Sequence, residues 1–393
     1  MGSVWITFSR PRSLHMIWTR HLIRILLILC LIGVLVRIRL IWFPANPFPS
    51  SPFARLLAAQ IRDGRRTGGL RLIPESGVLA RDHHRELRVL IEPLLSSGEG
   101  DYCGNRDLLI MVKSAAYEFD SRSAIRDTWA SQLNQRGRHV FVVGVMPTPA
   151  KKNFSQERLS QEALQYNDLL QVDFVEDYQN VSLKSFSMLL WAHWRCPAVP
   201  FLLNCDSDVL LFPGNIFRFL DQLRSNFGSA RFSPTLLPST ATSSSSSSSL
   251  FIYGDCWSGA KPDRNASAKW YVSERTWSGP VFPRYCGGPG YLLSGATVSP
   301  LLSQIPSIGF VENFPMDDIF FTGILSWAAE IGVYDHPGFV SSLTPDFNPC
   351  RRDLFSVHDW PAPSALRSAW TRYRTALPTC HFWHHRFIHQ YLL

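Results

Sequence analysis

Apolar runs and helical stripes alternate along the middle of the chain. Strand-like segments occupy residues 108–114, 139–145, 172–177 and 200–205. Between them, apolar side chains recur every three or four positions, as on one face of a helix, in residues 121–133, 155–170 and 182–194. Strands that alternate with helices indicate right-handed βαβ units and a parallel sheet buried on both faces. The pattern therefore predicts an α/β fold with a Rossmann-like, mostly parallel sheet and flanking helices.

A different pattern occupies the N-terminus. Residues 22–43 read LIRILLILCLIGVLVRIRLIWF, and the uninterrupted apolar part, Ile25 to Val36, is flanked by arginines. With these flanks the segment reaches the length of a transmembrane helix if the arginines extend toward the headgroups. No small-x-small cleavage site follows, which favours an uncleaved signal-anchor over a cleaved signal peptide. Residues 1–21 would then form a cytoplasmic tail, and the rest of the chain would enter the secretory lumen.

The remaining chain divides into a stem and one domain. Residues 44–100 carry Pro, Gly, Ser and Arg with little periodicity, which indicates a lumenal stem, although a short helix over residues 53–62 is an open alternative. Residues 101–393 are long enough for a single catalytic domain. A serine run near 239–249 cannot build a core and is expected to be an inserted loop.

Composition and charge change this picture little. The chain has 393 residues, of which 46% are hydrophobic and 18% are charged, so a packed core is possible. The net charge of +8 invites a nucleic-acid interpretation, but eight arginines and no acidic residue precede Asp63. No basic stripe with interleaved aromatic residues or zinc-finger spacing is present, so we expect no nucleic-acid partner.

Cysteines and sequons agree with a secretory compartment. Seven of the eight cysteines follow the membrane segment and none forms a CxxC pair, so an oxidising lumen would join most of them. Because seven is odd, at least one would be free or bonded to another chain, and the connectivity stays open. N-x-S sequons begin at Asn153, Asn180 and Asn265.

Two carboxylates follow the fourth predicted strand, in FLLNCDSDVLLF (201–212). Asp206 and Asp208 can both turn toward one divalent cation beyond the strand, where ligands bind in parallel sheets. A nucleotide-sugar transferase would use such a cation to hold a diphosphate. A phosphatase of the haloacid-dehalogenase type would instead use Asp206 as nucleophile and Asp208 as general acid, with Asp317 and Asp318 as the later acid pair. The residues Val209-Leu210 depart from the phosphatase pattern, so the transferase is favoured.

The chain resembles the family that contains β-1,3-galactosyltransferases, β-1,3-N-acetylglucosaminyltransferases and Fringe. The stretches R-x-A-I-R-x-T-W (122–129) and Y-x-N-V-S-L-K (178–184) are specific to it. Further matching blocks occur in the family's order, within residues 108–130, 140–144, 166–185, 201–212, 269–295, 316–323 and 333–339. A type II membrane anchor and a lumenal stem are usual in that family, so the resemblance implies a Golgi membrane enzyme.

The resemblance also implies a GT-A fold, an inverting mechanism and a Mn²⁺ ion bound to the UDP diphosphate. By position, Asp208 is the expected metal ligand, Asp206 supports the metal or the nucleotide, and His336 matches a metal-ligating histidine of the family. Asp318 is the expected catalytic base, with Asp317 beside it to set its pKa and position. A helix N-terminus that favours acidic residues is the alternative interpretation of this acid pair.

The donor would be bound by basic residues and glycine. Arg122 or Arg126 would reach uridine or phosphate as a forked donor, while the spacing of Trp129 favours a place in the core. Lys184 would meet a phosphate, against the default of an exposed helix lysine, and Gly288 would let the backbone approach the sugar closely.

Several features depart from the family pattern, among them Asn204, which stands where a lysine is common. Ser207 replaces the middle acid of a usual triplet, and Pro289 replaces a glycine. These changes motivate an alternative, a catalytically inactive lumenal glycan-binding or chaperone protein on the same fold. The favoured function is transfer of galactose or N-acetylglucosamine from a UDP-sugar to a glycan hydroxyl in β-1,3 linkage.

Overall fold

A computed structural model describes residues 78–81, 86–94, 101–147, 154–227, 250–308, 314, 316–343 and 347–380. The predicted tail (1–21), the predicted signal-anchor (22–43) and the serine run near 239–249 lie outside these residues. Within the described ranges, no helix has the length and apolarity needed to cross a membrane.

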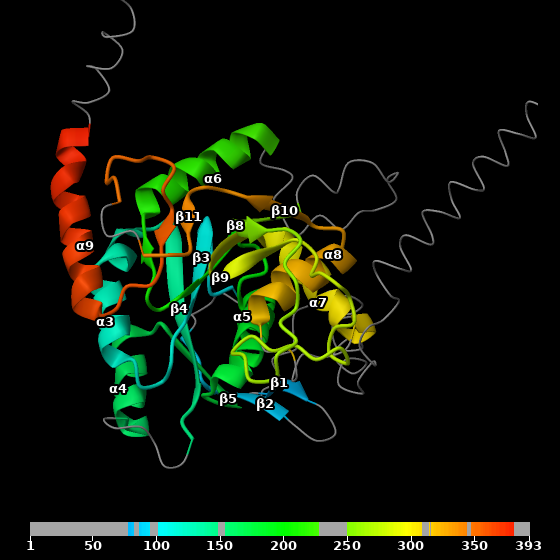
Figure 1. The fold of residues 1–393 in the computed structure, drawn as a ribbon. Helices are drawn as coiled ribbons and strands as arrows, with labels where there is room; N and C mark the ends of the chain where they lie inside the picture. Colours follow the sequence, from blue (N-terminus) through cyan, green and yellow to red (C-terminus); the bar gives the residue numbers. More distant parts are fainter. Residues whose placement is uncertain are drawn as a thin grey trace, which may run out of the picture.

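The described residues form a large mixed sheet at the centre of the domain (Figure 1). In spatial order, its strands are β1 (Val78–Arg81), β2 (Glu86–Ile91), β5 (Leu169–Val175), β4 (Gly137–Val145), β3 (Leu108–Lys113), β6 (Phe201–Asp206), β9 (Tyr285–Ser294), β8 (Phe251–Trp257) and β10 (Gly332–Asp335). The four strands predicted from apolar runs are β3, β4, β5 and β6, and they form the parallel centre β5-β4-β3-β6. The α/β prediction is therefore confirmed.

The outer strands are less parallel than predicted. β2 runs antiparallel to β5 on one side, and β9 runs antiparallel to both β6 and β8 on the other. β1 and β2 come from the segment assigned to the stem, so the domain includes residues well before 101 and that boundary was wrong. In β2 the buried Leu87 is followed by the exposed Arg88, the alternation of a strand with one face in water. No continuous apolar run marks such a strand.

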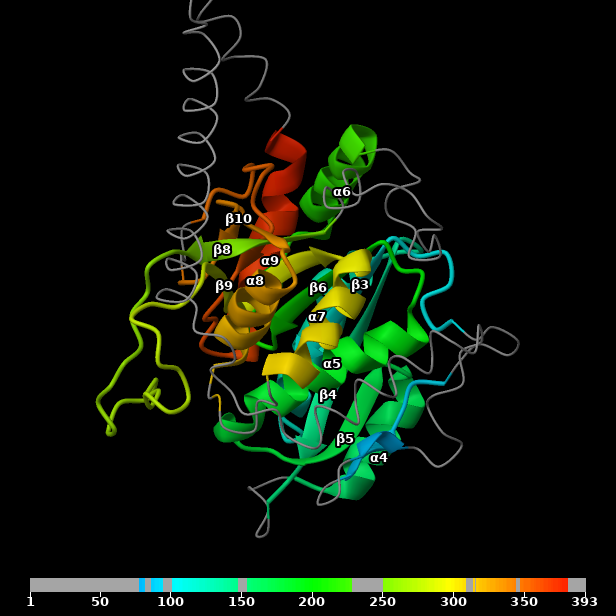
Figure 2. The same ribbon diagram turned by 90° about the vertical axis from the view of Figure 1, so that its right-hand side faces the viewer.

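The helices lie in two layers on the faces of the sheet. Figures 1 and 2 place α5, α7 and α8 over one face, and α3, α4, α6 and α9 over the other. Their bounds are α3 (Phe119–Asp127), α4 (Gln156–Tyr166), α5 (Val181–Arg195), α6 (Pro213–Phe227), α7 (Gly295–Ile308), α8 (Ser326–Ala328) and α9 (Pro363–Ala376). Short 3₁₀ helices are η1 (Trp129–Gln132), η2 (Tyr178–Asn180) and η6 (Leu377–Thr379), and η5 (Ile319–Leu325) is a π-helix.

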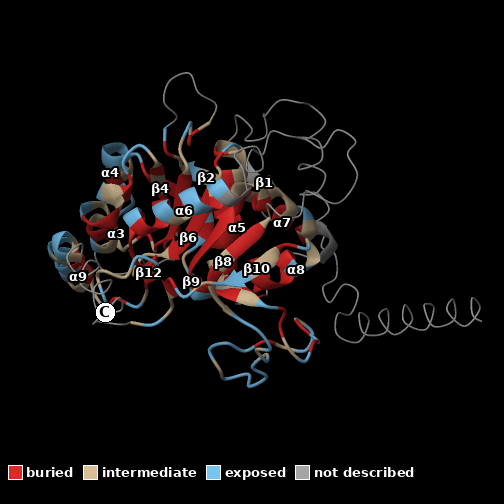
Figure 3. Ribbon diagram, turned by 90° about the horizontal axis from the view of Figure 1, so that it is seen from above, coloured by how far each residue is buried: buried red, intermediate tan, exposed pale blue. Residues whose placement is uncertain are grey.

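The core is divided by the sheet into two apolar clusters. Leu109 and Met111 of β3 pack in the cluster under α5 and α7, whereas Leu108 and Ile110 pack in the cluster under α3 and α9. Figure 3 shows the central strands buried and the outer turns of α4 and α9 exposed. This division follows from the period of two along a strand, because alternate side chains point to opposite faces.

A second, three-stranded sheet lies beside the first. It consists of β11 (Phe339–Val340), β12 (Ser356–Val357) and β7 (Leu210–Leu211). β12 runs antiparallel to β7, with Ser356 opposite Leu211 and Val357 opposite Leu210. This register brings His358, which follows β12, next to the turn with Asp206 and Asp208 that precedes β7.

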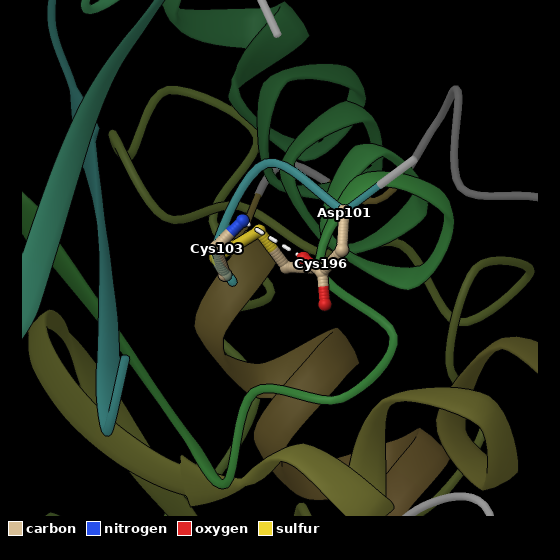
Figure 4. Close-up of side chains that lie close together, drawn as sticks. All are labelled: Asp101, Cys103 and Cys196. Atoms are coloured by element: carbon tan, nitrogen blue, oxygen red, sulfur yellow. Dashed lines mark hydrogen bonds between the residues drawn. A yellow bond between two sulfur atoms is a disulfide. The ribbon is translucent and has the colours of Figure 1, made fainter. Parts of the chain in front are cut away.

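Disulfides involve six of the seven cysteines beyond the predicted anchor. The pairs are Cys103–Cys196, Cys256–Cys286 and Cys350–Cys380, and Cys205 is free and buried in β6. Figure 4 shows the first pair, with the amide of Cys103 donating a hydrogen bond to Oδ1 of Asp101 at 2.8 Å. The prediction that most of these cysteines pair and that at least one does not is confirmed.

Candidate active site

A cavity of about 1030 Å³ opens where the parallel strands β3 and β6 end. Asp206, Asp208, Asp317 and Asp318 all line it, as do Gly288 and residues of the loop after β3. The volume lies at the upper end of the range for small-molecule sites, and the place is the one where ligands bind in such sheets. The acids that the sequence separates by more than a hundred positions therefore share one cavity.

A histidine lies close to two of these acids, Asp206 and Asp208. Asp206, Asp208 and His358 each offer one ligand atom, and these atoms lie within 4.8 Å of one another. Oδ1 of Asp208 is buried and accepts no hydrogen bond, and it lies 3.4 Å from Nε2 of His358. A buried carboxylate oxygen without a donor fits a cation, since leaving it unpaired costs free energy. These three residues therefore fit a divalent metal.

The ring orientation of His358 also suits a metal ligand. Its Nδ1 lies 2.9 Å from the carbonyl oxygen of Ser341. A proton on Nδ1 donated to this carbonyl leaves Nε2 facing Asp208, and once Nε2 loses its own proton its lone pair is free for a metal, as is usual for metal-bound histidines. Burial lowers the pKa of His358, but the neighbouring Asp208 carboxylate outweighs burial and raises the pKa to about 9.

His336, the histidine expected to bind the metal, does not line the cavity. Its ring stacks on Phe355 with centroids 4.6 Å apart, and its Nδ1 accepts a hydrogen bond from the amide of Gly338 at 3.0 Å. The prediction for His336 is wrong, because this imidazole packs on the residue before β12 and not toward the cavity. The strand in turn carries His358 to the acids.

Asp318 lies at the N-terminus of the π-helix η5 and faces the cavity. Its Oδ2 accepts a hydrogen bond from the amide of Gly288 at 3.0 Å, and its Oδ1 accepts one from the amide of Ile319 at 2.8 Å. Burial and the charge of Asp317 raise the pKa of Asp318 to about 6 despite these bonds. A carboxylate with such a pKa is ionised at neutral pH and basic enough to accept a proton from a substrate. The helix-capping interpretation also holds, because the same side chain caps η5.

Lys113, the last residue of β3, connects the two groups of acids. Its ammonium group lies 3.0 Å from Oδ1 of Asp206, 3.1 Å from Oδ2 of Asp317 and 3.1 Å from the carbonyl oxygen of Gly288. Burial lowers the pKa of Lys113, but Asp206 and Asp317 outweigh burial and hold the pKa well above its usual value. Lys113 is therefore charged and fixes both acids. Asp317 also accepts a short hydrogen bond from the hydroxyl of Ser185.

Two predicted donor-binding residues line the cavity with their polar groups already in use. The ammonium group of Lys184 donates to the carbonyl oxygen of Ser114 at 2.6 Å and pairs with Glu176 at 2.8 Å. Gly288 lies between Lys113 and Asp318, and its backbone bonds to both. Lys184 is buried rather than exposed on its helix. Both residues shape the wall that faces a ligand.

Arg122 and Arg126 do not line the cavity, so their predicted contact with the donor is wrong. Arg122 is fully buried, and its guanidinium group pairs with Glu162 of α4 at 2.7 Å and bonds to the backbone of the loop after β3. Arg126 pairs with Glu162 and Asp168 at 2.7 and 2.8 Å. Both guanidinium groups turn toward the buried carboxylate of Glu162, because such a buried charge requires a partner. Trp129 lies in the core, as predicted.

Ser207, which replaces an acid of the family pattern, contacts a carboxylate from another element. Its hydroxyl donates to Oε2 of Glu118 at 2.9 Å, and the same oxygen accepts bonds from the hydroxyl of Ser114 at 3.1 Å and the amide of Ala115 at 2.8 Å. Glu118 and Ser207 both line the cavity. A second carboxylate at position 207 would face Glu118 at this distance and repel it. The serine therefore fits its neighbour in this chain.

Sequence reasoning missed Lys113, Glu118 and His358. Lys113 could have been predicted from the sequence, since a lysine near the end of the strand-like run LLIMVKS lies at the ligand-binding edge of the sheet. His358 follows only a two-residue strand, and no periodicity marks so short an element. Its role depends on the pairing of β12 with β7, which sequence patterns do not reveal.

Comparison with known proteins identifies the class of this chain. The model of the galactosyltransferase family matches residues 120–243 and 230–337. Human UDP-GlcNAc:betaGal beta-1,3-N-acetylglucosaminyltransferase 9 is 30% identical over 341 residues, which cover 80% of this chain and 73% of that protein. Mouse acetylgalactosaminyl-O-glycosyl-glycoprotein beta-1,3-N-acetylglucosaminyltransferase is 32% identical over 278 residues, 67% of this chain and 64% of that protein. The protein is therefore a glycosyltransferase.

Within this class, the chain belongs to the galactosyltransferase family, to which the sequence motifs had pointed. The crystal structure of galactosyltransferase LgtC with donor and acceptor sugar analogues aligns with 68% of this chain and 95% of that one, at 10% identity and a TM-score of 0.32, which supports no conclusion. Family membership sets aside the phosphatase alternative. A sugar donor and a glycan acceptor follow from the class.

Proposed function

We propose that this protein is an inverting, Mn²⁺-dependent enzyme that transfers N-acetylglucosamine from its UDP conjugate to a glycan hydroxyl in β-1,3 linkage. One observation carries the proposal: Asp208 and His358, which fit a metal, line the same cavity as Asp318. The names of the relatives favour N-acetylglucosamine over galactose as the transferred sugar. The same names favour a terminal β-galactose or N-acetylgalactosamine as the acceptor.

Asp206, Asp208 and His358 would hold the metal and, through it, the donor diphosphate. When bound there, Mn²⁺ supplies Lewis-acid stabilisation of the negative charge on the departing UDP. Metal binding would displace the proton that His358 holds at neutral pH, and the resulting neutral imidazole beside two carboxylates suits Mn²⁺ better than Mg²⁺, which prefers oxygen ligands. Lys113 keeps Asp206 in place at 3.0 Å and is already charged, so it adds positive potential at this end of the cavity.

Asp318 would act as the catalytic base. Its carboxylate takes the proton from the acceptor hydroxyl while that oxygen forms a bond to the anomeric carbon, and the bond from this carbon to the diphosphate breaks on the opposite face. The raised pKa of about 6 increases the basicity of Asp318 without protonating it at neutral pH. The two hydrogen bonds from Gly288 and Ile319 fix the carboxylate before the substrate arrives.

The proposed setting is the Golgi lumen, with a GT-A catalytic domain on a single-pass type II anchor. Three disulfides among the described residues are typical of an oxidising compartment. The apolar segment 22–43 with its arginine flanks is the proposed anchor.

The test is release of UDP from UDP-N-acetylglucosamine with MnCl₂ and N-acetyllactosamine as acceptor. We expect the wild-type protein to turn over, and we expect Asp318→Asn to lose roughly 10²–10⁴-fold in kcat, the usual contribution of a general base. UDP binding by Asp318→Asn should be unchanged, which separates a chemical defect from misfolding. Equal rates for wild type and Asp318→Asn, with every UDP-hexose tried, would refute the proposal.

A further inference from the structure

An exposed tryptophan lines the same cavity as the proposed base. Trp257 at the end of β8 is 41% exposed and lines the cavity. Its indole packs on the backbone of Gly287, so closely that a Cβ on Gly287 would lie 2.7 Å from Cζ3 of the ring. The next residue, Gly288, donates its amide hydrogen to Asp318 at 3.0 Å. The indole therefore contacts Gly287, and the next residue of β9 contacts the proposed base.

Two more exposed aromatic rings line the same cavity. Tyr178 of η2 and Trp270 are each 45% exposed, and their rings meet edge to face with centroids 5.6 Å apart. Burial raises the pKa of Tyr178, and the charges of Asp317, Asp318 and Asp206 raise it further, so the hydroxyl lies within reach of the acids of the cavity. Trp270 belongs to the long loop between β8 and β9, drawn yellow-green in Figure 2.

Lys269 adds a hydrogen-bond donor to this pair. Its ammonium group lies 4.4 Å from the centroid of the Trp270 ring and 5.0 Å from that of the Tyr178 ring. Such a cation is held against the rings by their negative faces.

Exposed rings of this size inside a cavity indicate a ligand that covers them, since apolar surface in water is unfavourable. A pyranose ring has a face of C–H groups that packs on an aromatic ring and hydroxyls that bond around its edge. These three rings are far more exposed than the apolar residues that line the cavity near His358, among them Trp360 at 9%. Only the acceptor must reach Asp318 with a hydroxyl.

We propose that Trp257, Tyr178 and Trp270 form the acceptor subsite, in which the indole of Trp257 stacks on the sugar that receives the new bond. Tyr178 and Trp270, with Lys269 above them, hold the next part of the glycan. This inference rests on the proposed function, because it assigns to the acceptor the side of the cavity nearest the base. It makes the substrate a glycan with an unsubstituted C–H face on its terminal sugar.

The test separates acceptor binding from donor binding in the full chain. For Trp257→Ala we expect the KM for N-acetyllactosamine to rise about tenfold or more, with the KM for UDP-N-acetylglucosamine unchanged, since a stacked ring contributes on the order of a factor of ten. Trp257→Phe should recover part of the acceptor affinity. The matched control is Trp327→Ala, because Trp327 is 38% exposed on α8 and lies outside the cavity. An unchanged acceptor KM, or an equal rise in the donor KM, would overturn the subsite.

A binding measurement distinguishes failure of the subsite from failure of the proposed chemistry. Saturation-transfer NMR on the wild type, with N-acetyllactosamine or benzyl N-acetyl-α-galactosaminide and no donor, should show transfer that Trp257→Ala weakens. If the wild type fails to release UDP but this signal is present and sensitive to Trp257, the subsite stands and the transfer reaction is wrong. Absence of any saccharide signal, or a signal that Trp257→Ala leaves intact, contradicts the subsite.

Discussion

The ammonium group of Lys113 lies 3.1 Å from the carboxylate of Asp317, although the two residues are 204 positions apart. Through its second pair, with Asp206 at 3.0 Å, Lys113 joins the end of the cavity that fits a metal to the end that holds Asp318. Both halves of the proposed reaction therefore share one buried positive charge. We therefore expect a substitution of Lys113 to affect both ends of the cavity.

Transfer should depend on pH through Asp318. Its pKa is raised to about 6, so the base is protonated and inactive at lower pH and becomes active as pH rises through this value. The charged or titratable groups that act on it are Asp317, Lys113, Tyr178, Tyr285 and Tyr291. The measurement is kcat/KM from about pH 4.5 to about 8, with UDP binding followed in parallel. A rate that stays constant between about pH 5 and about 7 would contradict the assignment.

Lys113→Met should move this acid limb to higher pH. Lys113 lowers the pKa of Asp318, so loss of the ammonium group leaves the repulsion from Asp317 less compensated. We expect a shift of about one pH unit together with a fall in kcat of at least about tenfold. Lys184→Met is the control, since Lys184 pairs with Glu176 and does not act on Asp318. If both variants keep the wild-type limb, Lys113 has only a structural role.

His358→Ala should weaken Mn²⁺ binding, whereas His336→Ala should not. His358 offers its Nε2 to the same space as Asp206 and Asp208, while His336 stacks on Phe355 outside the cavity. We expect a loss in metal affinity of at least about tenfold for His358→Ala. Titration of the full-length protein with Mn²⁺, followed by the EPR signal of the free ion, measures this directly. Equal losses in the two variants would return His336 to consideration.

Asn204→Leu should stabilise the protein. Asn204 is buried in β6, and neither atom of its side-chain amide has a hydrogen-bond partner. Removing these two polar atoms should raise the free energy of unfolding by about 1–3 kcal/mol. Asn215→Leu is the matched control with the opposite sign, because the buried amide of Asn215 donates to the carbonyl oxygens of Arg351 and Leu354 at 3.1 and 2.9 Å. Thermal melts of both variants decide the matter, and a lower Tm for Asn204→Leu would show that the amide has a partner.

Of the two described sequons, we expect Asn265 rather than Asn180 to carry a glycan. Oδ1 of the exposed Asn265 accepts bonds from the amide and the hydroxyl of Ser267 at 3.1 and 2.8 Å, so the sequon is folded at the surface. The amide of Asn180 instead donates to Val175 at 2.9 Å, and the hydroxyl of its sequon partner Ser182 is buried.

Expression of the full chain in a secreting cell line tests this, in an Asn153→Gln background because Asn153 lies outside the described residues. The shift in mobility on deglycosylation should vanish in Asn265→Gln and persist in Asn180→Gln. The reverse pattern, or no shift in any variant, would show that the assignment is incorrect.

The centre of the fold was predictable because its strands are mostly apolar. Most residues of β3, β4, β5 and β6 are buried, with Asp173 and Val175 of β5 exposed, and this burial leaves a direct mark in the sequence. β2 is as long as β3 and β6 but has only one buried face, so no continuous apolar run distinguishes it from the stem. β9 runs through the glycine-rich stretch YCGGPGYLLS, whose composition is typical of turns, and only its pairing with β6 and β8 makes it a strand.

At the site, the acids were predictable and their partners were not. Asp206 and Asp208 follow a recognisable strand, and Asp317 and Asp318 precede a helix-like apolar segment. The choice of His336 failed because two histidines lie near the same small sheet, and only the pairing of β12 with β7 decides which one reaches Asp208. Arg122 and Arg126 look like surface donors in a helical stripe until Glu162 of α4 is placed between them.

The π-helix η5 has a consequence for how the chain can vary. A π-turn contains one residue more than an α-turn, so deletion of a single residue between Ile319 and Leu325 would restore a regular helix. The segment before it would then rotate by about 100°. Asp317 would swing away from Lys113, and Asp318 would leave Gly288, with every acid still present in the sequence. Length in this seven-residue turn is thus as strictly constrained as the identity of the two aspartates.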